Sequence, residues 1–259
     1  MCTLVVATRV WDSAPLVVAA NRDEQLDRPA AAPYRWARGD DPEIFAPRDL
    51  RAGGTWLGVR GAKLFVGITN RFTGAANVPG PRSRGELVLD ALAAGEVEAA
   101  ARHIAALDPS QHAPFHLIIA DREQAQLVWN DGATHHHERL DPGIHVLSER
   151  SRGAAPTQRD GLIRRRLVQR FGERLDGAEP DRGTWRTLMS EHADPTFEGP
   201  CVHSDDRGYG TRCSTLVRMR PDPDGIEFFH ADGRPCVTPY ADLSDMAAGR
   251  AAGFAASEP

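Results

Sequence analysis

Two short apolar runs, rich in β-branched residues, open the chain and narrow the folds that it can adopt. The first is Thr3-Leu-Val-Val-Ala-Thr8 and the second is Leu16-Val-Val-Ala-Ala20. The segment between them, Trp11-Asp-Ser-Ala-Pro15, is rich in turn-forming residues. Because such runs flanked by turn formers are typical of paired strands, we expect a β-hairpin here. Its first strand is expected to begin at the N-terminus itself.

Strands and helices then follow in groups. The Pro- and Arg-rich stretch 28–47 predicts a long loop, and a second hairpin is expected over 55–60 and 63–69. Ser83 and Glu86 form a capping-box pattern in front of a first helix. Further helices are expected over 96–107, 157–175 and 184–192, the last one capped by Asp181. Later strands are expected over 115–120, 126–129, 134–139, 144–147, 211–219, 226–230 and 236–238.

The order of these elements predicts the fold class. Strands, two helices, strands, two helices and strands follow one another, without the regular strand-helix-strand alternation of a parallel sheet. This order predicts an α+β fold, a four-layer αββα sandwich of two mainly antiparallel sheets flanked by helices. No internal repeat or linker divides the chain, so we expect one domain over 1–241. The stretch 242–259, rich in Ala, Gly and Ser, is expected to be a flexible tail.

Charge and hydropathy exclude two classes of function. The 259 residues carry a formal net charge of -5, and no basic patch favours nucleic-acid binding. No apolar run approaches the ~20 residues of a membrane span, and no signal peptide precedes the first strand. We therefore expect a soluble protein of the cytoplasm. The sequence does not set its oligomeric state, because edge strands look alike in monomers and dimers.

The sequence predicts neither a metal site nor another cofactor. His135, His136 and His137 are adjacent, but in a strand the side chain of His136 would face away from those of the other two. No carboxylate or cysteine at a suitable spacing completes a set of metal ligands. In a reducing compartment the cysteines are expected to be free thiols. They are spread without a Cys-x-x-Cys pair or zinc spacing, at Cys2, Cys201, Cys213 and Cys236.

Cys2 has the most specific chemistry of these residues. Methionine before a small residue is normally removed, so the mature chain is expected to begin with Cys2. The free α-amine would then share one short unit with the thiol, and its reference pKa is near ~7.7–8.0. It can therefore act as general base for its own thiol, directly or through one water. The alternative is an unreactive thiol at the start of a strand.

Three further polar groups are candidates for the same site. Asn21-Arg22-Asp23-Glu24 directly follows the second apolar run, where an arginine can hold a thiolate and a carboxylate can tune an α-amine. The alternative is a solvated turn with an internal ion pair. Asn70 ends the second hairpin and can donate to an oxyanion. Arg212 can bind a carboxylate or support the nucleophile, or it is a surface residue of an edge strand.

These segments together resemble a known family. Met-Cys-Thr at the start, Asn21-Arg22-Asp23-Glu24, Gly53-Gly54-Thr55-Trp56-Leu57-Gly58, Thr69-Asn70, His145-Val146-Leu147-Ser148 and Gly210-Thr211-Arg212 occur in that order. The ordered set is similar to the NRDE family, the transport and Golgi organisation protein 2-like proteins. That family is in turn similar to the N-terminal-nucleophile hydrolases that include penicillin V acylase and bile salt hydrolase.

The resemblance implies roles for particular residues. Cys2 would be both nucleophile and base, with Arg22 and Asp23 in support, Asn70 at the oxyanion and Arg212 as a later supporting arginine. The hydrolases separate their arginine and aspartate, so the supporting acid is either Asp23 or the following Glu24. Members of the family usually have asparagine after the Leu-Ser of the histidine segment, where this chain has Glu149. An ionised carboxylate cannot donate a hydrogen bond to an oxyanion.

Three functions remain open at this stage. The first is an enzyme that hydrolyses linear amide C–N bonds, or transfers an acyl group, on a small acylated molecule. The second is a non-catalytic protein on the same fold that binds and traffics haem, a lipid or acyl-coenzyme A. This function is implied by the resemblance, and Glu149 favours it. The third is a folded protein with a vestigial site.

Overall fold

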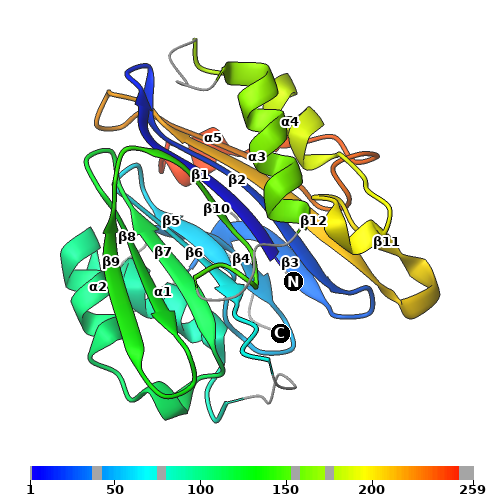
Figure 1. Cartoon of the computed structure of the whole chain (residues 1–259). Helices are drawn as coiled ribbons and strands as arrows, with labels where there is room; N and C mark the ends of the chain where they lie inside the picture. The colour runs from blue at the N-terminus through cyan, green and yellow to red at the C-terminus, as the bar shows by residue number, and fades with distance from the viewer. Residues whose placement is uncertain (1, 37–42, 75–79, 153–157, 173–177, 251–259) are drawn as a thin grey trace.

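Two antiparallel sheets form the centre of the molecule (Figure 1). The computed structural model describes residues 2–36, 43–74, 80–152, 158–172 and 178–250. Within them, each sheet has seven strands. Sheet A has the order β10 (Gly143–Leu147), β1 (Cys2–Trp11), β2 (Ala14–Gln25), β12 (Tyr209–Met219), β13 (Ile226–Ala231) and β14 (Ala241–Asp242), and β11 (His203–Ser204) pairs with β12. Sheet B has the order β3 (Ala30–Arg35), β4 (Ile44–Asp49), β5 (Leu57–Arg60), β6 (Leu64–Asn70), β7 (Phe115–Ala120), β8 (Ala125–Asn130) and β9 (His135–Leu140).

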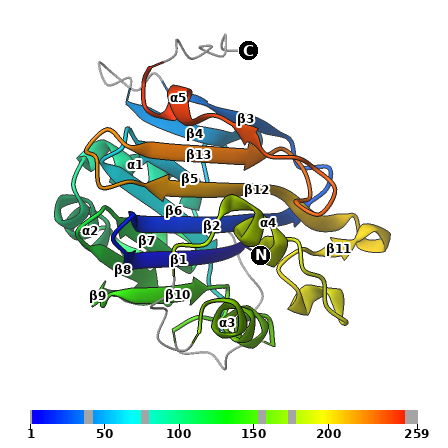
Figure 2. The same ribbon diagram turned by 90° about the horizontal axis from the view of Figure 1, so that it is seen from above.

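Helices cover the outer face of each sheet, which confirms the expected four-layer αββα sandwich (Figure 2). Among the described residues, one apolar core lies between the sheets, and two further cores lie between the sheets and their helices, one for each sheet. None of the described helices is long and apolar enough to cross a membrane. The helices are α1 (Arg84–Ala94) and α2 (Val97–Ala105) on sheet B, α3 (Gln158–Phe171) and α4 (Arg182–Met189) on sheet A, and the short α5 (Ser244–Ala247).

The N-terminal hairpin forms as the sequence predicts. β1 pairs with β2 so that Val6 lies opposite Val18 and Cys2 lies opposite Arg22. Because side chains alternate along a strand, the even-numbered residues within 4–7 and 16–20 face sheet B, and the odd-numbered ones face the core with α3 and α4. The hairpin therefore points Cys2 and Arg22 to the same side, between the two sheets.

The expectation that Asn21 to Glu24 follow the second strand is wrong. β2 continues through them to Gln25, because β12 pairs with it along its whole length, from Tyr209 opposite Gln25 to Met219 opposite Leu16. These polar residues are thus held by a central strand instead of a turn.

The expected loop over 28–47 is also wrong, because it contains β3 and β4. Pro33 lies in β3, an edge strand, at an irregularity between Ala31 and Tyr34. Pro47 lies beyond the two residues of β4 that pair with β5. Neither proline removes a hydrogen bond that the sheet needs, and this is where strands tolerate proline.

The other helices and strands lie close to their predicted positions. Ser83 caps α1, although its side chain accepts from the N–H of Gly85 and not from that of Glu86. Asp181 caps α4 by accepting from the Thr184 N–H. The ends of the expected helix 157–175 lie outside the described residues.

Two C-terminal expectations differ from the structure. Residues 236–238, expected to be a strand, form a turn instead. Part of the expected tail forms α5, because Ala247 packs into the core between the sheets and the Ser244 hydroxyl accepts from the Phe228 N–H. Residues 251–259 lie outside the described residues.

Buried neutral histidines make stability depend on pH. Burial lowers the pKa of His230, which is hydrogen-bonded to Thr215, to about 4. The reference value for an unfolded chain is about 6.5. The unfolded state therefore binds more protons as the pH falls from about 6.5 to 4, and stability is lost across that window.

We expect His230→Gln to flatten this dependence. Each pKa unit corresponds to about 1.4 kcal/mol, so the loss of unfolding free energy between pH 7 and 4 should shrink by up to about 3 kcal/mol. Urea denaturation at a series of pH values measures it. The exposed His103→Gln is the control and should keep the wild-type slope. Equal slopes in wild type and His230→Gln would contradict the assignment.

Candidate active site

A cavity of about 330 Å³ lies where strand ends from both sheets meet the start of α1. Cys2 of β1, Arg22 of β2 and Asn70 at the end of β6 all line it. The size lies at the lower end of the range of about 300–1,000 Å³ that is usual for ligand sites. The structure thus brings together three residues that the sequence proposed for one site.

Arg22 is held rigidly beside Cys2. Its side chain is only 4% exposed, and its Nη2 donates to Asp49 Oδ2 at 2.8 Å. Its guanidinium carbon lies 4.3 Å from the centre of the Trp56 ring, a cation–π contact. Arg22 Nη1 and Trp56 Nε1 are buried and have no hydrogen-bond partner among the described residues. Since buried donors without partners are costly, these two groups are suited to receive a ligand.

Asp49 is fixed as a charged acceptor. Besides Arg22, it accepts from Arg28 Nε at 2.7 Å and from the backbone N–H groups of Arg51 and Ala52. Burial acts to raise the pKa of the Asp49 carboxyl, but these donors outweigh it and the pKa is lowered. The carboxylate therefore stays ionised and keeps the Arg22 guanidinium in place.

Cys2 itself is half-buried. Burial raises the pKa of the Cys2 thiol, and the nearby Asp23 and Glu24 act in the same direction, whereas Arg22 opposes them. The thiol is therefore largely protonated at neutral pH. A base has to take its proton before the sulfur becomes a nucleophile.

Asp23 belongs to a buried network on the other face of β2. Its carboxylate accepts from Arg159 Nη1 of α3 at 2.9 Å and from Thr211 Oγ1 at 2.6 Å. Arg159 Nη1 also donates to Thr3 Oγ1, next to Cys2. Glu24, by contrast, is partly exposed and lies 3.7 Å from Arg22, on the face that Cys2 shares. Both acids line the cavity, so either one can influence the thiol.

Two other candidates lie away from the thiol. The Asn21 side chain faces α4, where its Nδ2 donates to the carbonyl oxygens of Met189 and Pro200. Arg212 donates to the Leu26 carbonyl and lines a smaller neighbouring cavity, which it shares with Arg22 and Trp56. Neither residue lines the Cys2 cavity.

The start of α1 forms the opposite wall. Gly54 allows this, because a Cβ atom there would lie 2.5 Å from the Gly85 carbonyl carbon. Ser83, Arg84 and Gly85 therefore reach the cavity. Burial lowers the pKa of Arg84, although a guanidinium remains protonated at neutral pH.

Charges around the cavity favour an anion. Among the described residues, four arginines but only three acidic residues line it: Arg22, Arg28, Arg82 and Arg84, with Asp23, Glu24 and Asp49. The positive end of a helix dipole adds to this balance.

Glu149 is not among the described residues that line the cavity. In the pairing of β1 with β10, Leu4 lies opposite Leu147, so the same register continued by two residues would bring Glu149 to Cys2. β10 ends before that, and the Glu149 carbonyl accepts from the Phe72 N–H instead. Met1, whose removal the sequence predicts, lies outside the described residues.

Three important residues were not found from sequence: Asp49, Arg84 and Arg159. Asp49 carries a weak signal, since an aspartate before Leu-Arg-Ala-Gly is typical of an Asx turn. Arg84 and Arg159 both lie in the first turn of a helix, where positive charge is unfavourable. Such local conflicts often mark functional positions.

Solved structures with a similar fold are N-terminal-nucleophile hydrolases. The N-acylethanolamine-hydrolyzing acid amidase ortholog of Caenorhabditis elegans matches with a TM-score of 0.59 and 15% identity, over 86% of this chain and 95% of that one. A mutant conjugated bile acid hydrolase of Clostridium perfringens matches with a TM-score of 0.51 and 11% identity, over 99% and 97%. The chain therefore has the fold of this class of hydrolases.

The chain belongs to the Transport and Golgi organisation 2 family, whose family model matches residues 1–230. The Transport and Golgi organization protein 2 homolog of Bos taurus is 27% identical over 241 residues, covering 81% of this chain and 83% of that protein. The human homolog is 29% identical over 239 residues, with the same coverage. The resemblance noted from the sequence is thus confirmed.

Removing the Asp23 carboxylate should destabilise the fold. Asp23→Asn leaves the buried Arg159 guanidinium without its counter-charge, and breaking such a pair costs about 3 kcal/mol or more. The partly exposed Glu24→Gln should cost less than about 1 kcal/mol. Urea unfolding of the two variants measures the difference. Equal losses would show that Asp23 is not the structural anchor of the site.

Proposed function

We propose that this chain is an N-terminal cysteine amidohydrolase or acyltransferase that acts on a small acylated molecule. The observation that carries the proposal is the position of Cys2, half-buried at a cavity wall and directly opposite the fixed Arg22. The proposal requires that Met1 is removed, so that the α-amine of Cys2 is free. A reducing compartment such as the cytoplasm would keep the thiol available.

The reaction begins with proton transfer from the thiol to the α-amine. The thiolate attacks the substrate carbonyl carbon, and the carbonyl oxygen takes the negative charge. When the tetrahedral intermediate collapses, the C–N bond breaks and the leaving amine takes the proton from the α-ammonium. Water then hydrolyses the acyl-cysteine thioester, or a second amine accepts the acyl group.

Asn70 and Arg22 are the candidate stabilising groups. Asn70 lines the same cavity as the thiol, and its amide can donate to the oxyanion. Arg22 supplies a positive charge close to the thiolate, and Asp49 holds it there.

We infer that the substrate carries an anionic group. The excess of arginine side chains around the cavity, with the start of α1, favours a carboxylate or phosphate near Arg84. The cavity volume favours a small molecule.

A second candidate function is non-catalytic binding of haem, a lipid or acyl-coenzyme A. The arginines favour it as well, because each of these ligands can carry carboxylate or phosphate groups. The cavity volume favours the small substrate over the larger ligands. Loss of turnover without loss of binding in a Cys2 variant would separate the two functions.

Cys2→Ala tests the enzymatic proposal. Alanine at this position also permits removal of Met1, and it leaves the α-amine without a nucleophile. We expect turnover of an N-acyl compound panel to fall by at least about 10³-fold, while Cys213→Ala, a buried thiol outside the cavity, retains it. Mass spectrometry of the intact protein reports whether Met1 is removed. Equal turnover in Cys2→Ala and wild type, or retained Met1 in an active protein, would refute the mechanism.

Arg84→Gln tests the anionic substrate. Loss of one charge-assisted hydrogen bond should lower kcat/KM about 10-fold for an N-acyl compound with a carboxylate, and much less for its uncharged amide analogue. Arg102→Gln is the matched control, because Arg102 is exposed, paired with Glu98 and outside the cavity. An equal loss on both substrates would argue against recognition of the carboxylate by Arg84.

A further inference from the structure

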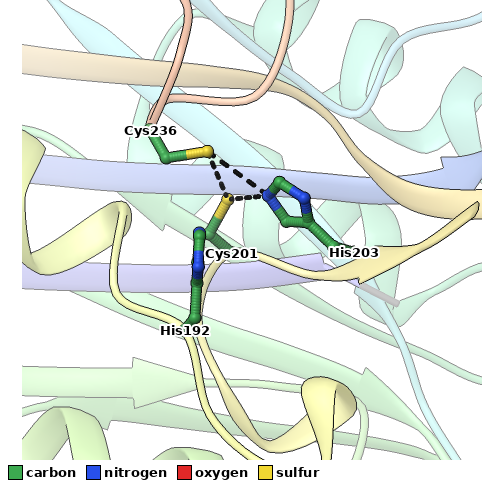
Figure 3. A group of neighbouring side chains, drawn as sticks. All are labelled: His192, Cys201, His203 and Cys236. Atoms are coloured by element: carbon green, nitrogen blue, oxygen red, sulfur yellow. Dashed lines mark hydrogen bonds between the residues drawn. The ribbon is translucent and has the colours of Figure 1, made fainter.

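Four potential metal ligands meet at one place in the fold (Figure 3). His192 follows α4, Cys201 precedes β11, His203 lies in β11, and Cys236 lies in the turn after β13. One ligand atom of each residue lies within 4.8 Å of those of the other three. Among the described residues this group is separate from all those that line the Cys2 cavity.

The distances fit the edges of a zinc tetrahedron. Zn–S bonds of about 2.3 Å and Zn–N bonds of about 2.0–2.1 Å give edges of about 3.8 Å between two sulfurs and about 3.6 Å between sulfur and nitrogen. Cys201 Sγ lies 3.7 Å from Cys236 Sγ. His203 Nε2 lies 3.5 Å from Cys201 Sγ and 3.3 Å from Cys236 Sγ. All three distances agree with one ion bound between these side chains.

The arrangement fits a metal better than a disulfide. A disulfide requires sulfurs about 2.05 Å apart and gives no role to the two imidazoles. His203 Nε2 lies almost equally close to both sulfurs, and a single proton on it can serve only one of them well. A shared cation satisfies both contacts. Two thiolates and two imidazoles in a tetrahedral arrangement favour zinc over the hard ions Mg²⁺ and Ca²⁺.

We propose that His192, Cys201, His203 and Cys236 bind one structural Zn²⁺. Four protein ligands close the coordination sphere, so the ion holds the chain together and takes no part in the reaction. The spacing of the cysteines in the sequence predicts no zinc site, because the ligands come from separate segments that only the fold brings together.

The bound ion would connect the loop before β11, which contacts the Asp23 network, to the turn after β13. The chain between α4 and β11 has little regular structure beyond a short 3-10 turn, η2 (Thr196–Glu198). Its Pro200 carbonyl accepts from Asn21, and its Phe197 carbonyl accepts from Arg159, the partner of Asp23. Zinc at Cys201 and His203 would tie this loop to the turn at Cys236, and so would hold the Asp23 network in place.

Metal analysis of the purified full-length chain tests the proposal. Elemental analysis under reducing conditions should find about one Zn²⁺ per chain in wild type. Cys201→Ser and Cys236→Ser should lose it, whereas Cys213→Ser, the matched buried thiol outside the cluster, should retain it. Wild type without zinc, or zinc retained in both cluster variants, would overturn the proposal.

A second measurement avoids dependence on variants that fail to fold. Zinc removed from wild type by a chelator should be replaceable by Co²⁺, with the visible absorption of a tetrahedral ion and a thiolate charge-transfer band that Zn²⁺ then abolishes. The chelated protein should melt at a lower temperature and recover on addition of Zn²⁺. Absence of the Co²⁺ spectrum, or a Cys201–Cys236 disulfide found by mass spectrometry of unreduced protein, would contradict the site.

Discussion

The ion pair between Arg22 and Asp49 joins the two sheets at the Cys2 cavity. Arg22 belongs to sheet A, and Asp49 is the last residue of β4 in sheet B. Their contact therefore fixes the separation of the two sheets at this place. A guanidinium this deeply buried is tolerated because a carboxylate and an aromatic face compensate for lost hydration. The segment after Asp49 then carries Gly54 against α1 and Trp56 against Arg22. This contact therefore holds one of the cavity's positive charges in place and helps to set the cavity's shape.

The polar residues of β2 make different contacts on its two faces. Arg22 and Glu24 face the cavity, while Asn21 and Asp23 hold α3, α4 and the loop before β11 on the other side. Four polar residues in a row are unusual in a buried central strand, and here each of them has a specific partner. This division places the thiol on one face of β2, while Asn21 on the other face holds Pro200, the residue before Cys201.

Most helices and strands could be predicted from local sequence patterns, whereas contacts between residues far apart in the sequence could not. The hairpins and α1 were predictable because alternation and capping act within a few residues, as with Ser83. β3 and β4 were not, since Pro33 and Pro47 look disruptive until it is known that Pro33 lies in an edge strand and that Pro47 lies beyond the residues of β4 that pair with β5. Cys2, Arg22 and Asn70 could be proposed for one site from chemistry and resemblance. Asp49, Arg84 and the cysteine–histidine cluster could not, because their partners lie far away in sequence.

The residues around the thiol limit which base can activate it. Among the described residues that line the cavity, none is a histidine or a lysine. Arginine remains protonated at neutral pH and cannot accept a proton. Transfer from a thiol to an ordinary carboxylate is uphill by roughly 4 pKa units, about 6 kcal/mol, and burial of the Cys2 thiol increases that difference. An α-amine lies within about one unit of a thiol. Within this cavity the amine that removal of Met1 would expose is therefore the base that the proposed reaction would use, and that removal is a condition of the proposed activity.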